Sequence, residues 1–348
     1  MKIKLTDIQE LWSAVEKVKS ATPRRSFPNE VCLETTDDGL AIHRYAESTY
    51  AEITIPAEVM EEGKVIVGNI DPVQWLRGEM TLEVEGTDLL LGNTKLRLSS
   101  ADLFLYSRMG HNCPVVEVTI DPAKILYTTE DNKETYSWVV IDGSDMICTD
   151  TINIAIATNE NQIIDGSITV PRDVLKIARK GTFVGLEGKK IWVFDDAFRY
   201  YSTLIEKPFP AGYFRKGITD KISLENPQVK LNQKELTQAL QLVISVSRDL
   251  VWRDGMAAFI LTNGQLIIDS YQSETGKVNL TLDPVASHGT FDVSCFPKSI
   301  LNAATCDSVD EVVIEGWFHP DHKRWAFLVH CGSVVSFIPS TGDGWREK

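Results

Sequence analysis

Apolar and polar residues alternate along much of this chain, which is the pattern of β-strands with one buried face. Alternating stretches run over 30–45, 50–59, 80–100 and 188–205, and Gly, Asp or Asn turns interrupt them. Helical spacing is rarer. Behind Asp7, a residue type that caps helix starts, apolar residues recur every three or four positions. The pattern therefore predicts a mixed protein with many strands and few helices.

The few helix signals recur in a fixed order. A short strand followed by a capped helix occurs three times, with Asp7, Asp121 and Asn232 as the caps. These units start about 110 residues apart, and such a period is typical of repeated domains. A second helix follows in each unit, with a proline near its start, over 71–77, 172–180 and 298–306. We predict an α+β chain of three tandem domains with two helices and antiparallel sheets each: 1–112, 113–220 and 221–348.

The run "MICTDTINIAIAT" over 146–158 contains a candidate catalytic residue. Asp150 lies between two predicted strands, where it could be a catalytic carboxylate, a metal ligand or a turn former. The sequence has no G-x-S-x-G elbow, glycine-rich phosphate loop or H-E-x-x-H helix to accompany it. His319 and His322 have ligand-like spacing, but Pro320 between them indicates a turn. We therefore predict a non-catalytic protein without cofactor or metal, in which Asp150 shapes a turn.

Composition and charge narrow the classes further. With 43% hydrophobic and 24% charged residues the chain is globular, and no apolar run approaches a membrane span. No secretion signal is evident, and the six cysteines are scattered without C-x-x-C spacing, so we predict reduced thiols and a cytoplasmic location. The net charge of −14 opposes nucleic-acid binding, unless positive charge gathers on one face. The predicted helical segments are slightly basic, whereas the remainder is strongly acidic.

Four short motifs, in their order along the threefold plan, resemble the β sliding clamp of bacterial DNA polymerase III. The motifs are Thr-Asp with alternating apolar residues at 149–155, "VPRDVL" from Val170, "KPFPAGY" from Lys207 and the C-terminal "SFIPS". The resemblance implies a head-to-tail ring dimer with helices lining its hole. Such a processivity factor encircles duplex DNA without sequence specificity. It tethers polymerase, clamp loader and other replication or repair proteins through short peptide motifs.

Three sets of functional residues follow from the resemblance. The expected DNA-binding cations attract phosphate without reading bases: Arg24, Arg25, Arg77, Arg172, Lys176, Arg179, Lys180, Lys234, Arg248, Arg253 and Lys298. The partner-peptide pocket between the second and third domains would use Thr149, Thr151, Ile152, Ile154, Ile338, Pro339 and Ser340. The dimer interface would include Leu103, Phe104 and Val246.

One departure from the family pattern bears on partner choice. A Gly-His-Arg-like run usually follows the Thr-Asp pair, whereas this chain has Thr151, Ile152 and Asn153. A divergent clamp, encoded by a phage or a plasmid, would fit this change. Two alternatives stay open: a β-rich carbohydrate-binding or hydrolytic protein that uses the eight tryptophans and paired carboxylates, and a trimeric clamp of the proliferating cell nuclear antigen type.

Overall fold

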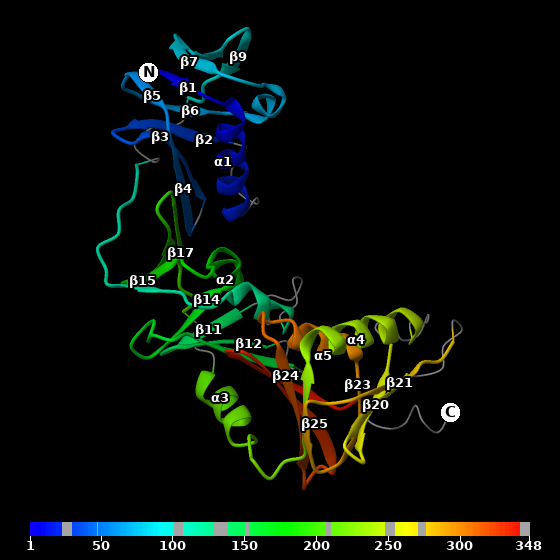
Figure 1. Cartoon of the computed structure of the whole chain (residues 1–348). Helices are drawn as coiled ribbons and strands as arrows, with labels where there is room; N and C mark the ends of the chain where they lie inside the picture. The colour runs from blue at the N-terminus through cyan, green and yellow to red at the C-terminus, as the bar shows by residue number, and fades with distance from the viewer. Residues whose placement is uncertain are drawn as a thin grey trace. The chain divides into compact units, whose positions relative to one another are not determined.

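The computed structural model describes residues 1–22, 30–46, 48–100, 107–128, 138–149, 153–206, 210–247, 255–270 and 276–341. The chain divides into two compact units (Figure 1). Unit 1 comprises Met1–Val118 and Gly181–Leu204, and unit 2 comprises Thr119–Lys180 and Ile205–Lys348. Within the described ranges, no helix is long and apolar enough to cross a membrane.

Two antiparallel sheets build unit 1. The smaller has the order β5-β1-β7-β8-β9, with β1 Lys2–Leu5, β5 Glu58–Glu61, β7 Met80–Glu85, β8 Asp88–Leu91 and β9 Thr94–Arg97. The larger has the order β10-β15-β16-β17-β4-β3-β2-β6, with β2 Val31–Thr36, β3 Gly39–Ala46, β4 Thr49–Ile55, β6 Lys64–Val67, β10 Val115–Glu117, β15 Phe183–Glu187, β16 Lys190–Phe194 and β17 Phe198–Thr203. Burial alternates along β1 and β8 of the smaller sheet, as the period-2 pattern predicts, whereas β3 and β4 of the larger sheet are buried on both faces.

Unit 2 also contains two antiparallel sheets. The first runs β14-β11-β12-β13-β26-β25-β24-β18-β22, with β11 Trp138–Asp142, β12 Asp145–Thr149, β13 Ile154–Thr158, β14 Ser167–Pro171, β18 Gln228–Asn232, β22 Ala286–His288, β24 Glu311–His319, β25 Arg324–Cys331 and β26 Val334–Pro339. The second runs β21-β20-β19-β23, with β19 Ala257–Thr262, β20 Gln265–Ser270, β21 Asn279–Leu282 and β23 Phe291–Cys295.

Helices occur in packed pairs, one pair for each predicted domain. In unit 1, α1 (Ile8–Ala21) packs against the 3₁₀ helix η1 (Asp71–Trp75). In unit 2, the 3₁₀ helix η3 (Pro122–Thr128) packs against α2 (Arg172–Ile177), and α4 (Gln233–Ser247) packs beside α5 (Pro297–Ala304) (Figure 1). All six predicted helical segments therefore contain a helix. The second-domain helix predicted over 121–134 is described as helical only for Pro122–Thr128, and 129–137 lies outside the described residues.

The predicted capping residues explain where two of these helices begin. The Asp7 carboxylate accepts a hydrogen bond from the Gln9 amide at 3.0 Å, which satisfies an amide that has no partner within the helix. At α4, the side-chain oxygen of Asn232 accepts from the amides of Lys234 and Glu235 at 3.0 and 3.2 Å. These two caps are confirmed.

Strands from neighbouring predicted domains share sheets. In unit 1, β17 pairs with β4 over Phe198–Ser202, and in unit 2, β13 pairs with β26 over Ile154–Ala157. This pairing explains why the two compact units do not follow the predicted boundaries, because backbone hydrogen bonds cross from one predicted domain into the next. The division into 1–112, 113–220 and 221–348 stays a prediction.

The cysteines are free thiols inside the protein. Five are buried, and Cys113 is partly exposed. Burial raises the pKa of Cys32 and of Cys306 to about 12, because a thiolate would lose its hydration there. These thiols are therefore protonated at neutral pH and chemically quiet.

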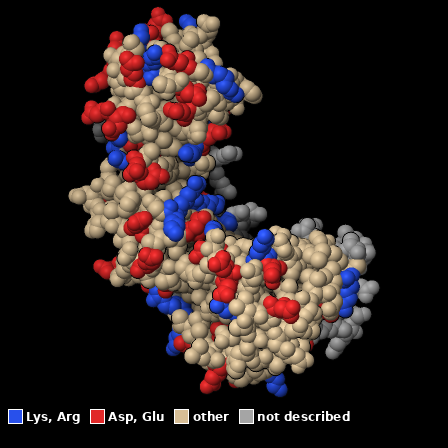
Figure 2. Space-filling view, viewed as in Figure 1, with Lys and Arg blue, Asp and Glu red and all other residues tan. Residues whose placement is uncertain are grey.

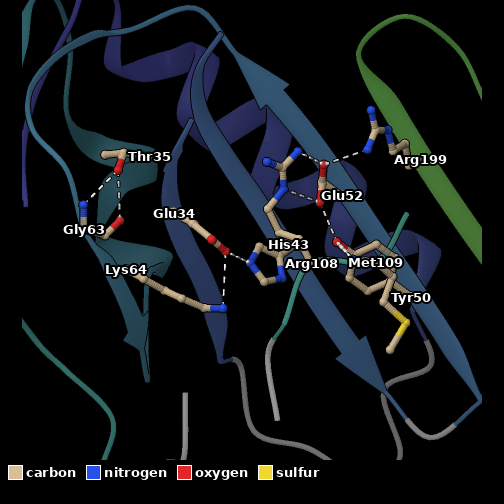
Figure 3. Close-up of polar contacts among 10 residues, drawn as sticks. All are labelled: Glu34, Thr35, His43, Tyr50, Glu52, Gly63, Lys64, Arg108, Met109 and Arg199. Atoms are coloured by element: carbon tan, nitrogen blue, oxygen red, sulfur yellow. Dashed lines mark hydrogen bonds and ion pairs between the residues drawn. The ribbon is translucent and has the colours of Figure 1, made fainter. Parts of the chain in front are cut away.

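A polar network stabilises the centre of the larger sheet of unit 1 (Figure 3). The Glu52 carboxylate on β4 is 2% exposed and accepts hydrogen bonds from the Nε and Nη2 of Arg108, at 3.0 and 2.6 Å. The Tyr50 hydroxyl donates to the same carboxylate at 2.5 Å. Burial alone would raise the pKa of Glu52, but these hydrogen bonds outweigh burial and hold the pKa below its usual value. Glu52 is therefore charged and paired at neutral pH.

His43 gives unit 1 an acid-sensitive point. Its ring is fully buried, Nε2 lies 3.2 Å from the Glu34 carboxylate, and Nδ1 has no hydrogen-bond partner among the described residues. Burial lowers the pKa of His43 from 6.5 to about 4. Below pH 6.5 the unfolded chain therefore binds a proton at this position before the folded chain does. Stability falls as the pH drops from 6.5 to 4, and this contribution is constant outside that window.

We expect His43→Gln to reduce the loss of stability that unit 1 suffers when the pH is lowered. Glutamine can still donate to Glu34 but does not titrate, so the loss of stability between pH 7 and pH 5 should be smaller by about 2 kcal/mol. Native-state hydrogen exchange of the β3 and β4 amides at both pH values measures this difference. Equal losses in the two proteins would show that His43 is protonated without penalty in the folded state.

Candidate partner-binding site and DNA-facing residues

An apolar face of the larger sheet of unit 2 carries Ile154, one residue of the predicted peptide site. The antiparallel register places Ile154 of β13 opposite Phe337 of β26, and Ile156 opposite Val335. Their side chains adjoin one apolar cluster, whose buried members are Val140, Ile147, Ile156, Ile218 and Leu328. Ile154, Phe214, Val335 and Phe337 are only partly buried against it. We call these nine residues the β13–β26 cluster.

The structure separates two residues that the sequence prediction put together. Successive side chains of a strand point to opposite faces, so Ile338 lies on the face opposite to Phe337. Ile338 is 1% exposed. On its own face, Ser336 Oγ accepts a hydrogen bond from the Tyr127 hydroxyl of η3 at 2.7 Å. Ile338 therefore belongs to the core beneath the helices and cannot share a cavity with Ile154, whereas Phe337 can.

The other predicted pocket residues have mixed placements. Thr149 is buried, and its hydroxyl donates to the Asn153 carbonyl at 2.8 Å, which fixes the chain before β13. Pro339 pairs with Ala326 at the end of β26. The Ser340 amide donates to the Trp325 carbonyl at 3.0 Å. Thr151 and Ile152 lie outside the described residues, as does Asp150.

Helix α3 (Ala211–Thr219) contributes to this cluster and was not predicted. The motif "KPFPAGY" leads into it, and the two prolines before the helix and the glycine at its second position are typical of a loop. Phe214 and Ile218 pack on the β13–β26 cluster. Arg215 holds the helix to the sheet through Asp142 and Asp145, with nitrogen–oxygen distances of 3.3 and 2.6 Å. The apolar residues at 214 and 218, four positions apart, were the available signal.

A cation borders the cluster. The Lys221 ammonium lies 4.9 Å from the ring centroids of both Trp317 and Phe337, which is within the range of cation–π attraction. Burial lowers the pKa of Lys221. This arrangement suits an extended peptide with apolar anchors: partly exposed apolar side chains would take the anchors, and the nearby charge would interact with an acidic group.

The predicted DNA-binding cations that the structure describes lie on helices or directly after them. Arg172 and Lys176 belong to α2, with Arg179 and Lys180 after it; Lys234 belongs to α4, Lys298 to α5, and Arg77 follows η1. Some are restrained: Arg172 Nη2 donates to the Leu126 carbonyl at 3.1 Å, and Lys176 pairs with Asp173 at 3.0 Å. Arg24, Arg25, Arg248 and Arg253 lie outside the described residues.

Charge is mixed over the visible surface. On the face in Figure 2, acidic and basic side chains interleave over both units. The predicted interface residue Val246 is half-buried on α4, whereas Leu103 and Phe104 lie outside the described residues. The rings of His319 and His322 are 4.3 Å apart, and among the described residues no group of three or more His, Cys, Asp or Glu side chains could hold a metal ion.

Comparison with solved structures identifies the fold. The chain is similar to the Helicobacter pylori β clamp bound to a DNA ligase peptide, with 15% identity and a TM-score of 0.76, over 98% of this chain and 100% of that one. It is similar to the Bacillus subtilis DNA polymerase sliding clamp, with 16% identity and a TM-score of 0.77, over 99% of both chains. It is also similar to the β subunit of Streptococcus pyogenes DNA polymerase, with 17% identity and a TM-score of 0.76, over 99% of this chain and 100% of that one. No protein-family model and no curated protein sequence matches this chain.

These likenesses define the class of fold: the chain has the fold of a DNA clamp. The three clamps compared above are bacterial, and the chain is also similar over 98% of its length to the DNA polymerase III subunit β of Pseudomonas aeruginosa. The low identities make this chain a divergent example of the fold. The predicted α+β fold class is confirmed.

Proposed function

We propose that this chain is a DNA sliding clamp, a non-catalytic processivity factor of a DNA polymerase. The observation that carries the proposal is the likeness to β clamps over 98–99% of the chain, from end to end rather than over one motif. The three helix pairs support it, because each predicted domain supplies one. Two copies of three such domains would close a ring in the cytoplasm.

Electrostatics support a ring that slides. Lys and Arg on the helices would attract the phosphates of encircled duplex DNA without reading its bases. The remaining surface is acidic enough to bring the net charge to −14, which disfavours side-on binding of DNA elsewhere. The ring would then hold DNA by its closed shape and would need little affinity.

The β13–β26 cluster is the proposed partner site. The Helicobacter pylori clamp that this chain resembles is bound to a DNA ligase peptide. In this chain, Ile154, Phe337 and Phe214 are the partly exposed apolar side chains that would receive the anchors of such a peptide. Polymerase and clamp loader would reach the ring through peptides of this kind.

Topological binding gives the test of the proposed function. The protein is threaded onto linear duplex DNA, the DNA is closed with ligase, and the complex is gel-filtered at about 0.5 M salt, where purely electrostatic binding is lost. We expect the protein to stay with the circle and to leave it when one restriction site is cut. Loss from the intact circle, or retention after cutting, would contradict the proposal. Sedimentation of the protein alone should give twice 38.9 kDa, not three times.

A further inference from the structure

A cleft opens beside the helices of unit 2, and it shares no residue with the β13–β26 cluster. It has a volume of about 520 Å³, which is within the range of small-molecule sites. Its walls come from η3, from the first turns of α4, and from the segment after α5. Two ammonium groups line it, those of Lys124 and Lys234, together with one carboxylate, that of Asp307.

The cleft has a fixed frame. The Gln233 side-chain amide donates to the carbonyls of Ala304 and Asp307, both at 2.7 Å, and so joins the start of α4 to the end of α5. The Cys306 thiol lies 3.1 Å from the Asn302 carbonyl and 3.5 Å from the Lys124 carbonyl, so η3 adjoins the same segment. The backbone that carries both lysines is therefore held in place before any ligand arrives.

The charges in the cleft favour an anion. Among the described residues neither Lys124 nor Lys234 forms an ion pair, so both ammonium groups are available. The Asp307 carboxylate already accepts from the Ser308 amide at 2.8 Å and from the Ser333 hydroxyl at 3.4 Å. Hydroxyl and amide side chains complete the lining, at Thr237, Gln238, Thr305 and Ser308. Two ammonium groups outnumber the single carboxylate, which leaves the cleft with a net positive charge that attracts an oxyanion.

We infer that this cleft is a phosphate-binding site that takes a phosphate group carried on a larger molecule. Lys124 and Lys234 bind the phosphate oxygens, and the neutral side chains hydrogen-bond to the remainder. Two kinds of molecule carry such a phosphate. One is the backbone of duplex DNA, and this possibility rests on the proposed clamp function; the other is a free nucleotide, which does not depend on that function.

The test uses the full chain and the double variant K124A/K234A. The matched control is K4A/K277A, which removes the same charge from lysines outside the cleft, where Lys4 pairs with Glu79 and Lys277 with Asp269. Calorimetric titration with ATP, without divalent metal, and with a short duplex at low salt supplies the two arms. We expect K124A/K234A to weaken binding at least fivefold relative to the control, and D307N to strengthen it.

The outcomes separate the sources. Weakening in the ATP arm alone identifies a free nucleotide, weakening in the duplex arm alone identifies backbone phosphate, and weakening in both identifies a shared phosphate site. Equal binding by the two double variants in both arms overturns the inference. Retention of the wild-type protein on circular DNA is measured separately, so a failure of the clamp function is distinguishable from a failure of the cleft.

Discussion

Replacing Arg108 with alanine should lower the free energy of opening of the β3–β4 region by about 3 kcal/mol, because it leaves a buried carboxylate without its cation. Glu52 is 2% exposed, and both of its oxygens accept hydrogen bonds from Arg108. In R108A the carboxylate keeps the Tyr50 hydroxyl and a distant Arg199, whose Nη1 lies 4.0 Å away. Native-state hydrogen exchange of the β4 amides measures the loss.

Arg199→Ala supplies the matched control. It removes a guanidinium from the same carboxylate, but this side chain is 42% exposed and at the limit of ion-pair distance. The expected loss is below about 1 kcal/mol. A second check is E52Q/R108A, which removes the buried charge and should recover part of the stability that R108A loses. If R108A and R199A cost the same, the carboxylate is hydrated and the network of Figure 3 is not a stability determinant.

The pH dependence of the stability difference between the wild type and R108A shows whether R108A is destabilised by the unpaired charge of Glu52 or by lost packing. In the wild type, hydrogen bonds hold the pKa of Glu52 below its usual value. The charged carboxylate therefore contributes fully to stability at neutral pH, and this contribution is lost as the pH falls from the usual carboxyl pKa through the lowered one. In R108A the carboxylate is buried without a cation, so its pKa should rise and acid should relieve the penalty. The stability gap between the two proteins should therefore narrow from pH 7 towards pH 4. A gap that is constant with pH would indicate lost packing of the arginine stem.

Much of the fold could be predicted, because local rules agree with the tertiary structure. The Asp7 and Asn232 caps and the alternating strands each carry their own physical signal. The shared sheets could not be predicted: which strand pairs with β4 or β13 depends on contacts far along the sequence. Period-2 patterns identify strands but do not name their partners.

The candidate site was only partly predictable for two physical reasons. Helix α3 forms in a stretch whose prolines and glycine favour a loop, and it is held by Arg215 contacting Asp142 and Asp145, a tertiary interaction. On β26, "SFIPS" favours Ile338 as the apolar anchor, whereas the register of the sheet places Phe337 on the same face as Ile154. A shift of one residue moves every side chain of a strand to the other face.

Phe337→Ala should weaken binding of a clamp-binding peptide at least tenfold, about 1.4 kcal/mol, because it removes a partly exposed ring from the β13–β26 cluster. The peptide is taken from a bacterial replication protein and titrated by fluorescence anisotropy. The variant should still elute as the wild type does, because the ring is at the margin of the cluster and not in its buried centre.

Ile338→Ala is the opposite case and tests the face assignment. Ile338 is 1% exposed beneath the helices, so the variant should lose about 2–4 kcal/mol of stability while it binds the peptide within about twofold of the wild type. Ile338 and Phe337 are neighbours on one strand, so a general disturbance of β26 would affect both measurements in both variants. The predicted result is a crossed one: F337A impairs binding more than folding, and I338A impairs folding more than binding. If folded I338A fails to bind while F337A binds normally, the peptide uses the helix-side face, and the site proposed on β13 and β26 is wrong.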